Sequence, residues 1–212
     1  MQQKQDIKGF TILELLVVIT IVAIVSAVGY PNFMDWRKDR EVRLAVEKVT
    51  TMLKSINTQA QRGNFAVVQL YVADGKDSTS FQTRGINQET EATVTNTPGQ
   101  KINCSYNTSY WRISDSLVDS FTLDIKTQID PRGTVCFSKD TRHYLSEDKL
   151  KQPQQNISVD GRIVNNYLII CSSDAKCPLS GWKDPTYLVE WNRFGNISKY
   201  KWNEKRNVWT RI

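Results

Sequence analysis

The sequence predicts an α+β fold in which one long N-terminal helix packs on an antiparallel β-sheet head. Two observations in its 212 residues support this fold class. A dense apolar block at residues 10–33 is followed by an apolar stripe at helical spacing. After Gly63 the chain changes to short runs rich in β-branched and aromatic residues, separated by turn sequences. A helix followed by consecutive strands is typical of an α+β domain.

The apolar block is long enough to cross a membrane. As a helix, residues 10–30 would span about 30 Å, which matches the hydrocarbon core of a bilayer. Lys4 and Lys8 precede the block and favour a cytoplasmic N-terminus. A plain membrane anchor would account for this composition. A secretory signal peptide cleaved after Ala27-Val28-Gly29 would account for it as well.

Two features of the block go beyond an anchor or a signal peptide. Glu14 places a carboxylate inside the apolar run, where a charge is costly and usually functional. Pro31 lacks a backbone N–H, and its ring clashes with the carbonyl group of Ala27. Together with Gly29 it is predicted to weaken or bend the helix.

The helix is predicted to continue beyond the block as an amphipathic helix to about residue 62. Its apolar residues recur at three- and four-residue spacing, with polar residues between them. They are Val42, Ala45, Val49, Met52, Ile56 and Ala60. Gly63 is suited to end the helix. Because the apolar stripe has to be buried, this second half of the helix is predicted to pack on the sheet.

Short runs after Gly63 are predicted to be strands, and the last two form a hairpin around a polar turn at residues 203–206. The runs are residues 65–72, 110–113, 120–125, 134–137, 166–170, 187–191, 197–202 and 208–212. Turn sequences such as Thr97-Pro98-Gly99 and Asp160-Gly161 separate them. Residues 74–100 and 139–156 are polar, and we predict a long surface loop or insertion in the first and a similarly polar segment in the second.

Four cysteines, Cys104, Cys136, Cys171 and Cys177, all follow the apolar block. An even number on the exported side of a membrane segment favours disulfides, and four cysteines allow three pairings. A bridge between Cys171 and Cys177 is favoured, because the loop between them is short and polar. Because no Cys-x-x-Cys pair is present and His143 is the only histidine, we predict no metal site.

The sequence contains no recognisable catalytic motif. It has no phosphate-binding glycine loop, no Gly-x-Ser-x-Gly sequence and no His-Glu-x-x-His sequence. His143 would have to serve any serine triad by itself, and it lies in a polar context. We therefore predict a protein that is not an enzyme and needs no cofactor.

The C-terminal region combines basic and aromatic residues. The candidates for nucleic-acid contact are Lys199, Lys201, Trp202, Lys205, Arg206, Trp209 and Arg211. Basic groups neutralise phosphates, and aromatic rings stack on exposed bases. A final β-hairpin, with its aromatic residues packed on the sheet and its charges facing water, accounts for the same pattern.

The N-terminal pattern closely resembles the prepilin signature of type IV pilins and type II secretion pseudopilins. Gly9 matches the glycine before the cleavage point, and Phe10 matches the first mature residue, which is N-methylated in that family. Glu14 is then the fifth mature residue, where the family has its glutamate. Pro31 is the twenty-second, where many members have a helix-bending proline. The match covers about 30 residues without a gap, with the polar start, Gly9 and the apolar run expected of a processed leader.

The resemblance implies a structural subunit with three parts. Residues 1–9 would be a cytoplasmic leader, residues 10–33 a transmembrane and filament-core helix, and residues 34–212 a globular head. A prepilin peptidase would cleave between Gly9 and Phe10 and methylate the new amine, which keeps its charge. In the filament, Glu14 would pair with the Phe10 amine of a neighbouring subunit. The alternative is that Glu14 is an unpaired, protonated carboxyl group in the membrane.

The implied partners are other pilin or pseudopilin subunits, the prepilin peptidase, the inner-membrane assembly platform and membrane lipid. The implied location is the bacterial inner membrane, with a single pass and the head in the periplasm, and then the pilus or pseudopilus. The length of the chain favours a minor subunit over a small major pilin. The alternative is a pilus-associated subunit that binds DNA for uptake.

A second, weaker resemblance is to the GspH/FimT branch of pilin-like proteins. It rests on the sequence from Leu53 to Arg62 followed by Val67-Val68-Gln69-Leu70, and on Phe194-Gly195-Asn196-Ile197 near the end. That branch often has a Gly-Arg motif near its C-terminus. The nearest sequences here are Arg193-Phe194-Gly195 and Gly161-Arg162, so the motif is not cleanly present.

Overall fold

The computed structural model describes residues 11–99, 102–105, 108–111, 117–129, 132–138, 157–164, 166–173, 177–178, 180–192 and 194–212. The predictions for Gly9, Phe10 and residues 139–156, which include His143, lie outside these ranges. The chain divides into two compact units, Met1–Lys38 and Asp39–Ile212.

Helix α1 (Ile12–Gln61) contains the described part of the apolar block. Within the first unit its large apolar side chains from Ile12 to Val25 are 49–81% exposed. By length and composition, no single described helix qualifies as a membrane span, whereas segments Ile12–Ala27 and Asn32–Gln61 qualify together as a bent pair. The effect proposed for Gly29 and Pro31 stays a prediction.

The C-terminal end of α1 is closed by a glycine motif. Gly63 has a left-handed backbone, with φ of 77°. Its N–H donates to the Ala60 carbonyl over 3.1 Å, and the Asn64 N–H donates to the Gln59 carbonyl over 3.2 Å. These two bonds form a Schellman motif, which satisfies carbonyl groups that the helix end leaves unpaired. The sequence therefore places the end of this helix correctly.

Two antiparallel sheets account for most of the second unit. The four-stranded sheet has the order β3 (Leu117–Leu123), β2 (Thr79–Ile86), β1 (Val67–Asp74), β5 (Arg132–Ser138). The five-stranded sheet has the order β11 (Val208–Arg211), β10 (Ile197–Asn203), β9 (Thr186–Trp191), β8 (Tyr167–Ser172), β4 (Ile125–Thr127). A separate hairpin pairs β6 (Ile157–Val159) with β7 (Arg162–Val164). The predicted α+β class is confirmed.

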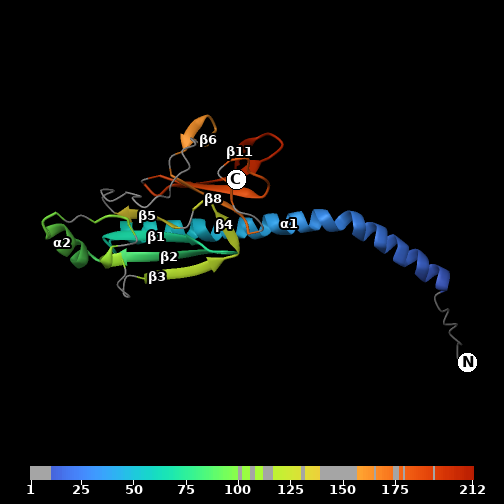
Figure 1. Ribbon diagram of the computed structural model, residues 1–212, viewed down its shortest axis with the longest axis horizontal. Helices are drawn as coiled ribbons and strands as arrows, with labels where there is room; N and C mark the ends of the chain where they lie inside the picture. Colours follow the sequence, from blue (N-terminus) through green and yellow to red (C-terminus); the bar gives the residue numbers. More distant parts are fainter. Residues whose placement is uncertain are drawn as a thin grey trace, which may run out of the picture. The chain divides into compact units, whose positions relative to one another are not determined.

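The main core lies between the two sheets and the second half of α1 (Figure 1). The apolar stripe from Val42 to Ala60 is buried, as the helical spacing predicts. From β1, Val68, Leu70 and Val72 join this core, and from β9, Tyr187, Val189 and Trp191 join it. Successive strand residues point to opposite faces, so each sheet has a second face with a core of its own.

These second faces carry smaller clusters. On the four-stranded sheet, Val67, Ile86 and Cys136 pack with Val94 of helix α2 (Gln88–Asn96) and with Trp111 of the 3₁₀ helix η1 (Ser109–Trp111). On the five-stranded sheet, a cluster rich in aromatic residues packs under the β6–β7 hairpin. Its large members are Tyr167, Leu188, Tyr200, Trp202 and Trp209.

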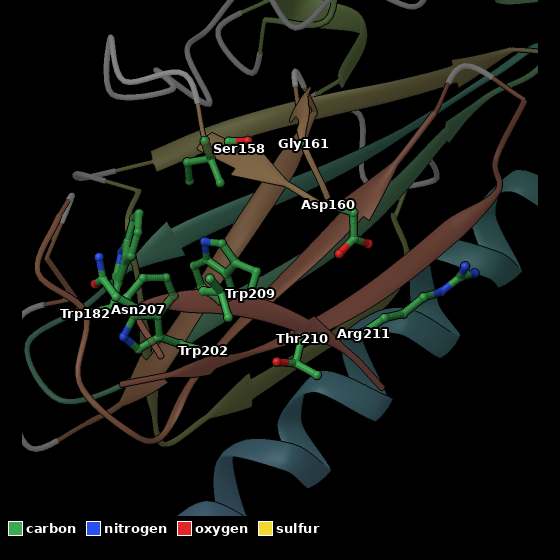
Figure 2. A pocket seen from close by; sticks show the side chains of 11 residues that line it. Ser158, Asp160, Gly161, Trp182, Trp202, Asn207, Trp209, Thr210 and Arg211 are labelled. Atoms are coloured by element: carbon green, nitrogen blue, oxygen red, sulfur yellow. The ribbon is translucent and has the colours of Figure 1, made fainter. Parts of the chain in front are cut away.

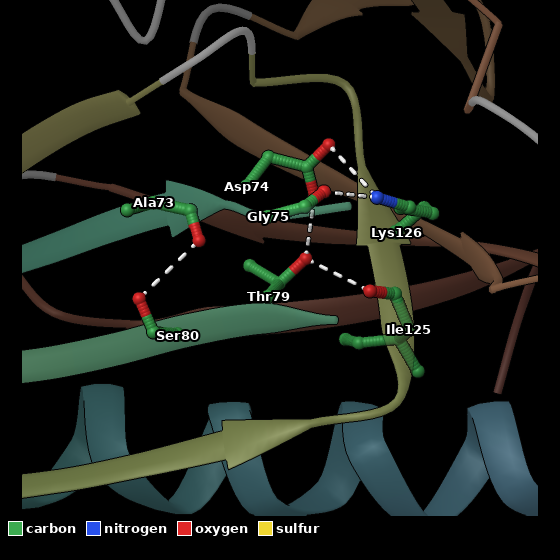
Figure 3. Close-up of polar contacts among 7 residues, drawn as sticks. All are labelled: Ala73, Asp74, Gly75, Thr79, Ser80, Ile125 and Lys126. Carbon is green, nitrogen blue, oxygen red and sulfur yellow. Dashed lines mark hydrogen bonds and ion pairs between the residues drawn. The ribbon is translucent and has the colours of Figure 1, made fainter. Parts of the chain in front are cut away.

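A buried polar cluster joins the two sheets (Figure 3). Thr79 on β2 donates to an Asp74 carboxylate oxygen over 2.7 Å and also lies 2.9 Å from the carbonyl oxygen of Ile125 on β4. The Lys126 ammonium lies 3.7 Å from Asp74 Oδ2 and donates to the Gly75 carbonyl. The side chains of Lys126 and Asp74 are only 9% and 16% exposed. Such a pair contributes to stability only while both partners are present.

Three details differ from the predicted elements. Residues 74–100, predicted as a long surface loop or insertion, contain β2 and α2. Two of the alternate buried positions of β2 are threonines, Thr79 and Thr83, beside the apolar Phe81, so the strand lacks a clear apolar alternation. The described part of the strand predicted at residues 110–113 lies in η1, where the Trp111 indole donates to the Asn103 carbonyl over 2.9 Å. The strand predicted at residues 120–125 is divided at Asp124, and its two parts join different sheets.

Candidate assembly helix and C-terminal sheet face

Glu14 lies in the first turn of α1, and a neighbouring threonine caps this turn. The Glu14 N–H donates to Thr11 Oγ1 over 3.2 Å, and the Leu15 N–H donates to the Thr11 carbonyl over 3.1 Å. This is the N-cap arrangement of a Thr-x-x-Glu sequence, and an acidic group is favourable at the positive end of a helix dipole. Sequence reasoning did not identify the capping role of Thr11, although the spacing of Thr11 and Glu14 was sufficient to suggest it.

Glu14 is an isolated acidic group on an apolar helix surface. The apolar side chains around it, from Ile12 to Val18, are about half exposed or more. No other Asp or Glu occurs between residues 11 and 34. A surface of this kind excludes water when it packs against lipid or other helices, and a charge there is costly without a partner. Phe10, whose amine is the predicted partner, lies outside the described residues.

Lys201 on β10 faces α1. Its ammonium lies 2.7 Å from Asp39 Oδ1 on the helix and 3.2 Å from Asp184 Oδ1. The Tyr187 hydroxyl donates to the same Asp39 oxygen over 2.8 Å. Burial lowers the pKa of Lys201, but hydrogen bonds to Asp39 and Asp184 outweigh it and raise the pKa above its usual value. Burial and then the Asp39 bond also raise the pKa of Tyr187.

Lys199 repeats this arrangement two residues earlier on the same face of β10. Its ammonium lies 2.5 Å from Glu47 Oε1, about two helical turns beyond Asp39. Two of the predicted nucleic-acid contacts are therefore ion-paired to the helix in this structure. Both ion pairs connect β10 to α1.

The two tryptophans predicted to stack on bases lie on the opposite face of the sheet. Trp202 is 6% exposed and Trp209 is 5% exposed, and both belong to the aromatic cluster. They are directly opposite each other in the β10–β11 register. This agrees with the hairpin interpretation for the aromatic residues. The hairpin interpretation expects the charges of Lys199 and Lys201 to face water, but in the structure they face the helix α1.

The remaining basic candidates lie at the surface. Lys205 and Arg206 are exposed in the turn between β10 and β11, and Arg211 is exposed on β11. Two sequences are possible counterparts of the Gly-Arg motif. In the first, Arg193-Phe194-Gly195, the arginine lies outside the described residues. Arg162 forms an ion pair with Glu190 and donates to the Tyr200 hydroxyl over 2.8 Å. Nucleic-acid contact by any of these residues stays a prediction.

All four cysteines are bonded. Cys171 pairs with Cys177, which is the bridge that the sequence favours, and Cys104 pairs with Cys136. The second bridge ties the segment before η1 to β5. Among the described residues, no group of three or more His, Cys, Asp or Glu side chains could hold a metal ion.

Replacing Lys201 with alanine should destabilise the head. The change removes the cation that neutralises Asp39 and Asp184, but the Lys201 side chain is 30% exposed, so water already screens these charges. We therefore expect the free energy of unfolding to fall by about 1 kcal/mol. Lys205→Ala, in the exposed turn, is the matched control and should leave stability unchanged. Chemical denaturation of both variants measures the difference, and equal stability would contradict the helix-docking role of Lys201.

Comparisons with known proteins agree with the N-terminal pattern. Residues 4–30 match a family model described as the prokaryotic N-terminal methylation motif. The chain is also similar to a fimbrial protein of Moraxella nonliquefaciens, with 35% identity over 71 residues. The aligned part covers 34% of this chain and 42% of the fimbrial protein. No solved structure matches the chain.

Three observations therefore converge on one family. The methylation motif includes Gly9, Phe10 and Glu14. The fold has one long N-terminal helix followed by antiparallel sheets. The similarity to a fimbrial protein agrees with both. Together they identify the chain as a type IV pilin-like protein.

Proposed function

We propose that this protein is a structural subunit, a minor pilin or pseudopilin, that is assembled into a type IV pilus or a type II secretion pseudopilus. The observation that carries the proposal is the methylation motif on a helix whose apolar side chains are exposed from Ile12 to Val25. Before assembly, lipid of the inner membrane would cover this surface. After assembly, the helices of neighbouring subunits would cover it.

Processing would prepare the chain for assembly. A prepilin peptidase would cut between Gly9 and Phe10, so that the new N-terminal amine lies four residues before Glu14. A methylated amine keeps its positive charge. Two opposite charges that meet in an apolar environment tolerate burial far better than either alone. The pair between Glu14 of one subunit and Phe10 of the next would set the axial register of the filament.

Incorporation into filaments tests the proposal. Sheared surface filaments, or filaments overproduced in the host, should contain the processed chain, and loss of the host's prepilin peptidase should retain it in the membrane as the full-length form. A chain that is processed but never recovered with filaments or with other pilin-like subunits would contradict the structural role.

The second candidate function is DNA binding during uptake. The observation that favours it is the exposure of Lys205 and Arg206 in the β10–β11 turn and of Arg211 on β11, the edge strand of the five-stranded sheet. Ion pairs hold Lys199 and Lys201 on the helix, so these three exposed cations would make the phosphate contacts.

The salt dependence of binding tests this candidate. We expect Lys205→Ala combined with Arg206→Ala to flatten the slope of log affinity against log salt by roughly two units, because each phosphate contact contributes about 0.7 to 0.9. The binding measurements use the full chain in detergent, with duplex DNA and with single-stranded DNA. Thermal unfolding shows that the variant is folded. An unchanged slope, or no binding at low salt, would remove the DNA function.

A further inference from the structure

The two edge strands of the five-stranded sheet differ in how far they are covered. At one edge, all three residues of β4 are buried. At the other edge lies β11, in which Val208, Thr210 and Arg211 are exposed and only Trp209 is buried. Arg211 is the single charged residue of β11, and the strand has no proline or glycine. Natural proteins usually protect an exposed edge with prolines, bulges, several charges or a covering segment, so β11 is open to pairing with another strand.

The register of the β10–β11 hairpin shows which main-chain groups of β11 face outwards. The Ile212 N–H donates to the Lys199 carbonyl over 3.1 Å, immediately beyond the paired residues of the two strands. Hydrogen-bonded and non-hydrogen-bonded pairs alternate along an antiparallel ladder. Trp209 and Arg211 therefore occupy non-hydrogen-bonded positions, and their N–H and carbonyl groups point away from β10.

Two pockets flank β11, one on each face of the sheet. The first has a volume of about 660 Å³ and lies on the side of the β6–β7 hairpin, where Trp209 lines it. The second has a volume of about 610 Å³ and includes Thr210 and Lys201, which lie opposite each other in the register and share the face towards α1. In Figure 2, Trp209 points towards the hairpin and Thr210 points the other way. Alternate side chains of a strand added to β11 would therefore reach different pockets.

The inner wall of the first pocket is apolar. The rings of Trp182, Trp202 and Trp209 form a contiguous surface, with ring centroids 5.0–5.2 Å apart. The indole nitrogens of Trp202 and Trp209 are buried, so the pocket meets ring carbon atoms. Asp160 and Arg211 line the pocket with opposite charges, and both are exposed. Burying a charge against the tryptophan wall is costly, so the pocket favours an apolar side chain.

The second pocket is polar and carries both kinds of charge. Lys201 pairs with Asp184 over 3.2 Å, and the Glu204 carboxylate accepts from the Asp184 N–H over 3.4 Å. Lys205 lines the same pocket from the turn. Acids and bases balance in this lining, so it favours neither an acidic nor a basic side chain. The pocket instead suits a neutral side chain that donates and accepts hydrogen bonds, such as a hydroxyl group.

We propose that β11 binds an extended, neutral peptide strand of another protein chain, which adds to the free edge of the sheet. The strand runs antiparallel to β11, as the described strands of this sheet do with their neighbours. Main-chain hydrogen bonds to Trp209 and Arg211 hold it, and the pockets on the two faces select its side chains. Its residues opposite Trp209 and Arg211 place apolar side chains in the first pocket, and the residues between them place hydroxyl groups in the second. The site uses no residue of the assembly helix and does not depend on the proposed function.

A short synthetic peptide of alternating valine and threonine residues, labelled with fluorescein, tests the proposal by fluorescence anisotropy. It is titrated with the full chain in detergent micelles, and empty micelles correct for partitioning of the peptide. We expect saturable binding. N-methylation of the valine amides should weaken binding about tenfold or more, because these N–H groups point at β11, whereas N-methylation of the threonine amides should leave the affinity unchanged. Equal effects of the two methylation patterns, or no saturable binding, would overturn the proposal.

Two substitutions at one position separate the main-chain contact from the side chain. Arg211→Pro removes an N–H group that points away from β10, and proline is tolerated at such positions of edge strands. Arg211→Ala keeps this N–H group and removes the charge. We expect Arg211→Pro to bind the peptide about tenfold more weakly than Arg211→Ala, with equal thermal stability. Equal affinity of the two variants would contradict strand addition. If Arg211→Pro proves less stable, the methylated peptides on the unaltered chain decide the question.

The other occupant to distinguish is a second copy of this chain. Sedimentation of the full chain in detergent, at the protein concentrations of the titration, measures self-association. The proposal predicts a monomer that binds the peptide. A dimer that Arg211→Pro dissociates and Arg211→Ala does not would show that the edge pairs with its own copy, and it would overturn the assignment to another protein chain.

Discussion

Glu14→Ala is expected to lower incorporation into filaments by about a hundredfold while leaving membrane insertion and processing intact. Alanine improves the apolar character of the helix, so insertion does not need the carboxylate. Assembly does need it, because without Glu14 the Phe10 amine of the next subunit is buried unpaired. Breaking a buried ion pair costs about 3 kcal/mol, which is about a hundredfold in an association equilibrium. Quantitative immunoblotting of membrane and filament fractions measures the effect.

Two further variants isolate the charge from the shape. Glu14→Gln has nearly the same volume without the negative charge and should fail to assemble in the same way. Ile21→Ala shortens another exposed apolar side chain of the same helix and should assemble far better than either. Normal assembly of Glu14→Gln would show that the negative charge of Glu14 does not set the register of the filament.

Asp74→Asn is expected to destabilise the head by about 3 kcal/mol, because it leaves the Lys126 ammonium buried without its counter-charge. Asparagine keeps the size of the side chain and an acceptor for Thr79. The loss is therefore electrostatic and is not a cavity effect. Equilibrium unfolding in urea, monitored by tryptophan fluorescence, measures the change in free energy.

A double-mutant cycle tests the same pair. Lys126→Met fills the same volume without a charge, so Asp74→Asn should cost much less in its presence, as expected for groups that interact directly. Asp77→Asn is the control, because Asp77 is exposed in the same β1–β2 turn. Equal effects of Asp74→Asn in the two backgrounds would show that Asp74 and Lys126 do not stabilise each other.

The structural features that the sequence predicts well are determined by local patterns. The helix stripe from Val42 to Ala60 has one apolar face at a constant period, and Gly63 supplies the left-handed residue that ends the helix. The motif around Glu14 is likewise contiguous in the chain. In each case the residues that determine the structure are neighbours in sequence.

The rest depends on residues that are distant in sequence. The alternation of Lys199, Tyr200, Lys201 and Trp202 shows that charges and rings lie on opposite faces of a strand, but not that Asp39 and Glu47 cover the charged face. Strand β2 was not predicted, because its buried positions include threonines, which are typical of loops when they occur beside glycine and serine. Nothing local to Asp124 indicates that the strand changes sheets there.

The central claim is that this chain is a processed pilin-like subunit, and the mass of its N-terminal peptide tests it most directly. Protein is extracted from membranes with detergent, digested and analysed by tandem mass spectrometry. The account predicts a first residue of Phe10 carrying one N-methyl group, and a Gly9→Val variant that keeps the intact N-terminus. A chain that begins at Tyr30, or one that keeps Met1 through Gly9 in the presence of the prepilin peptidase, would contradict it.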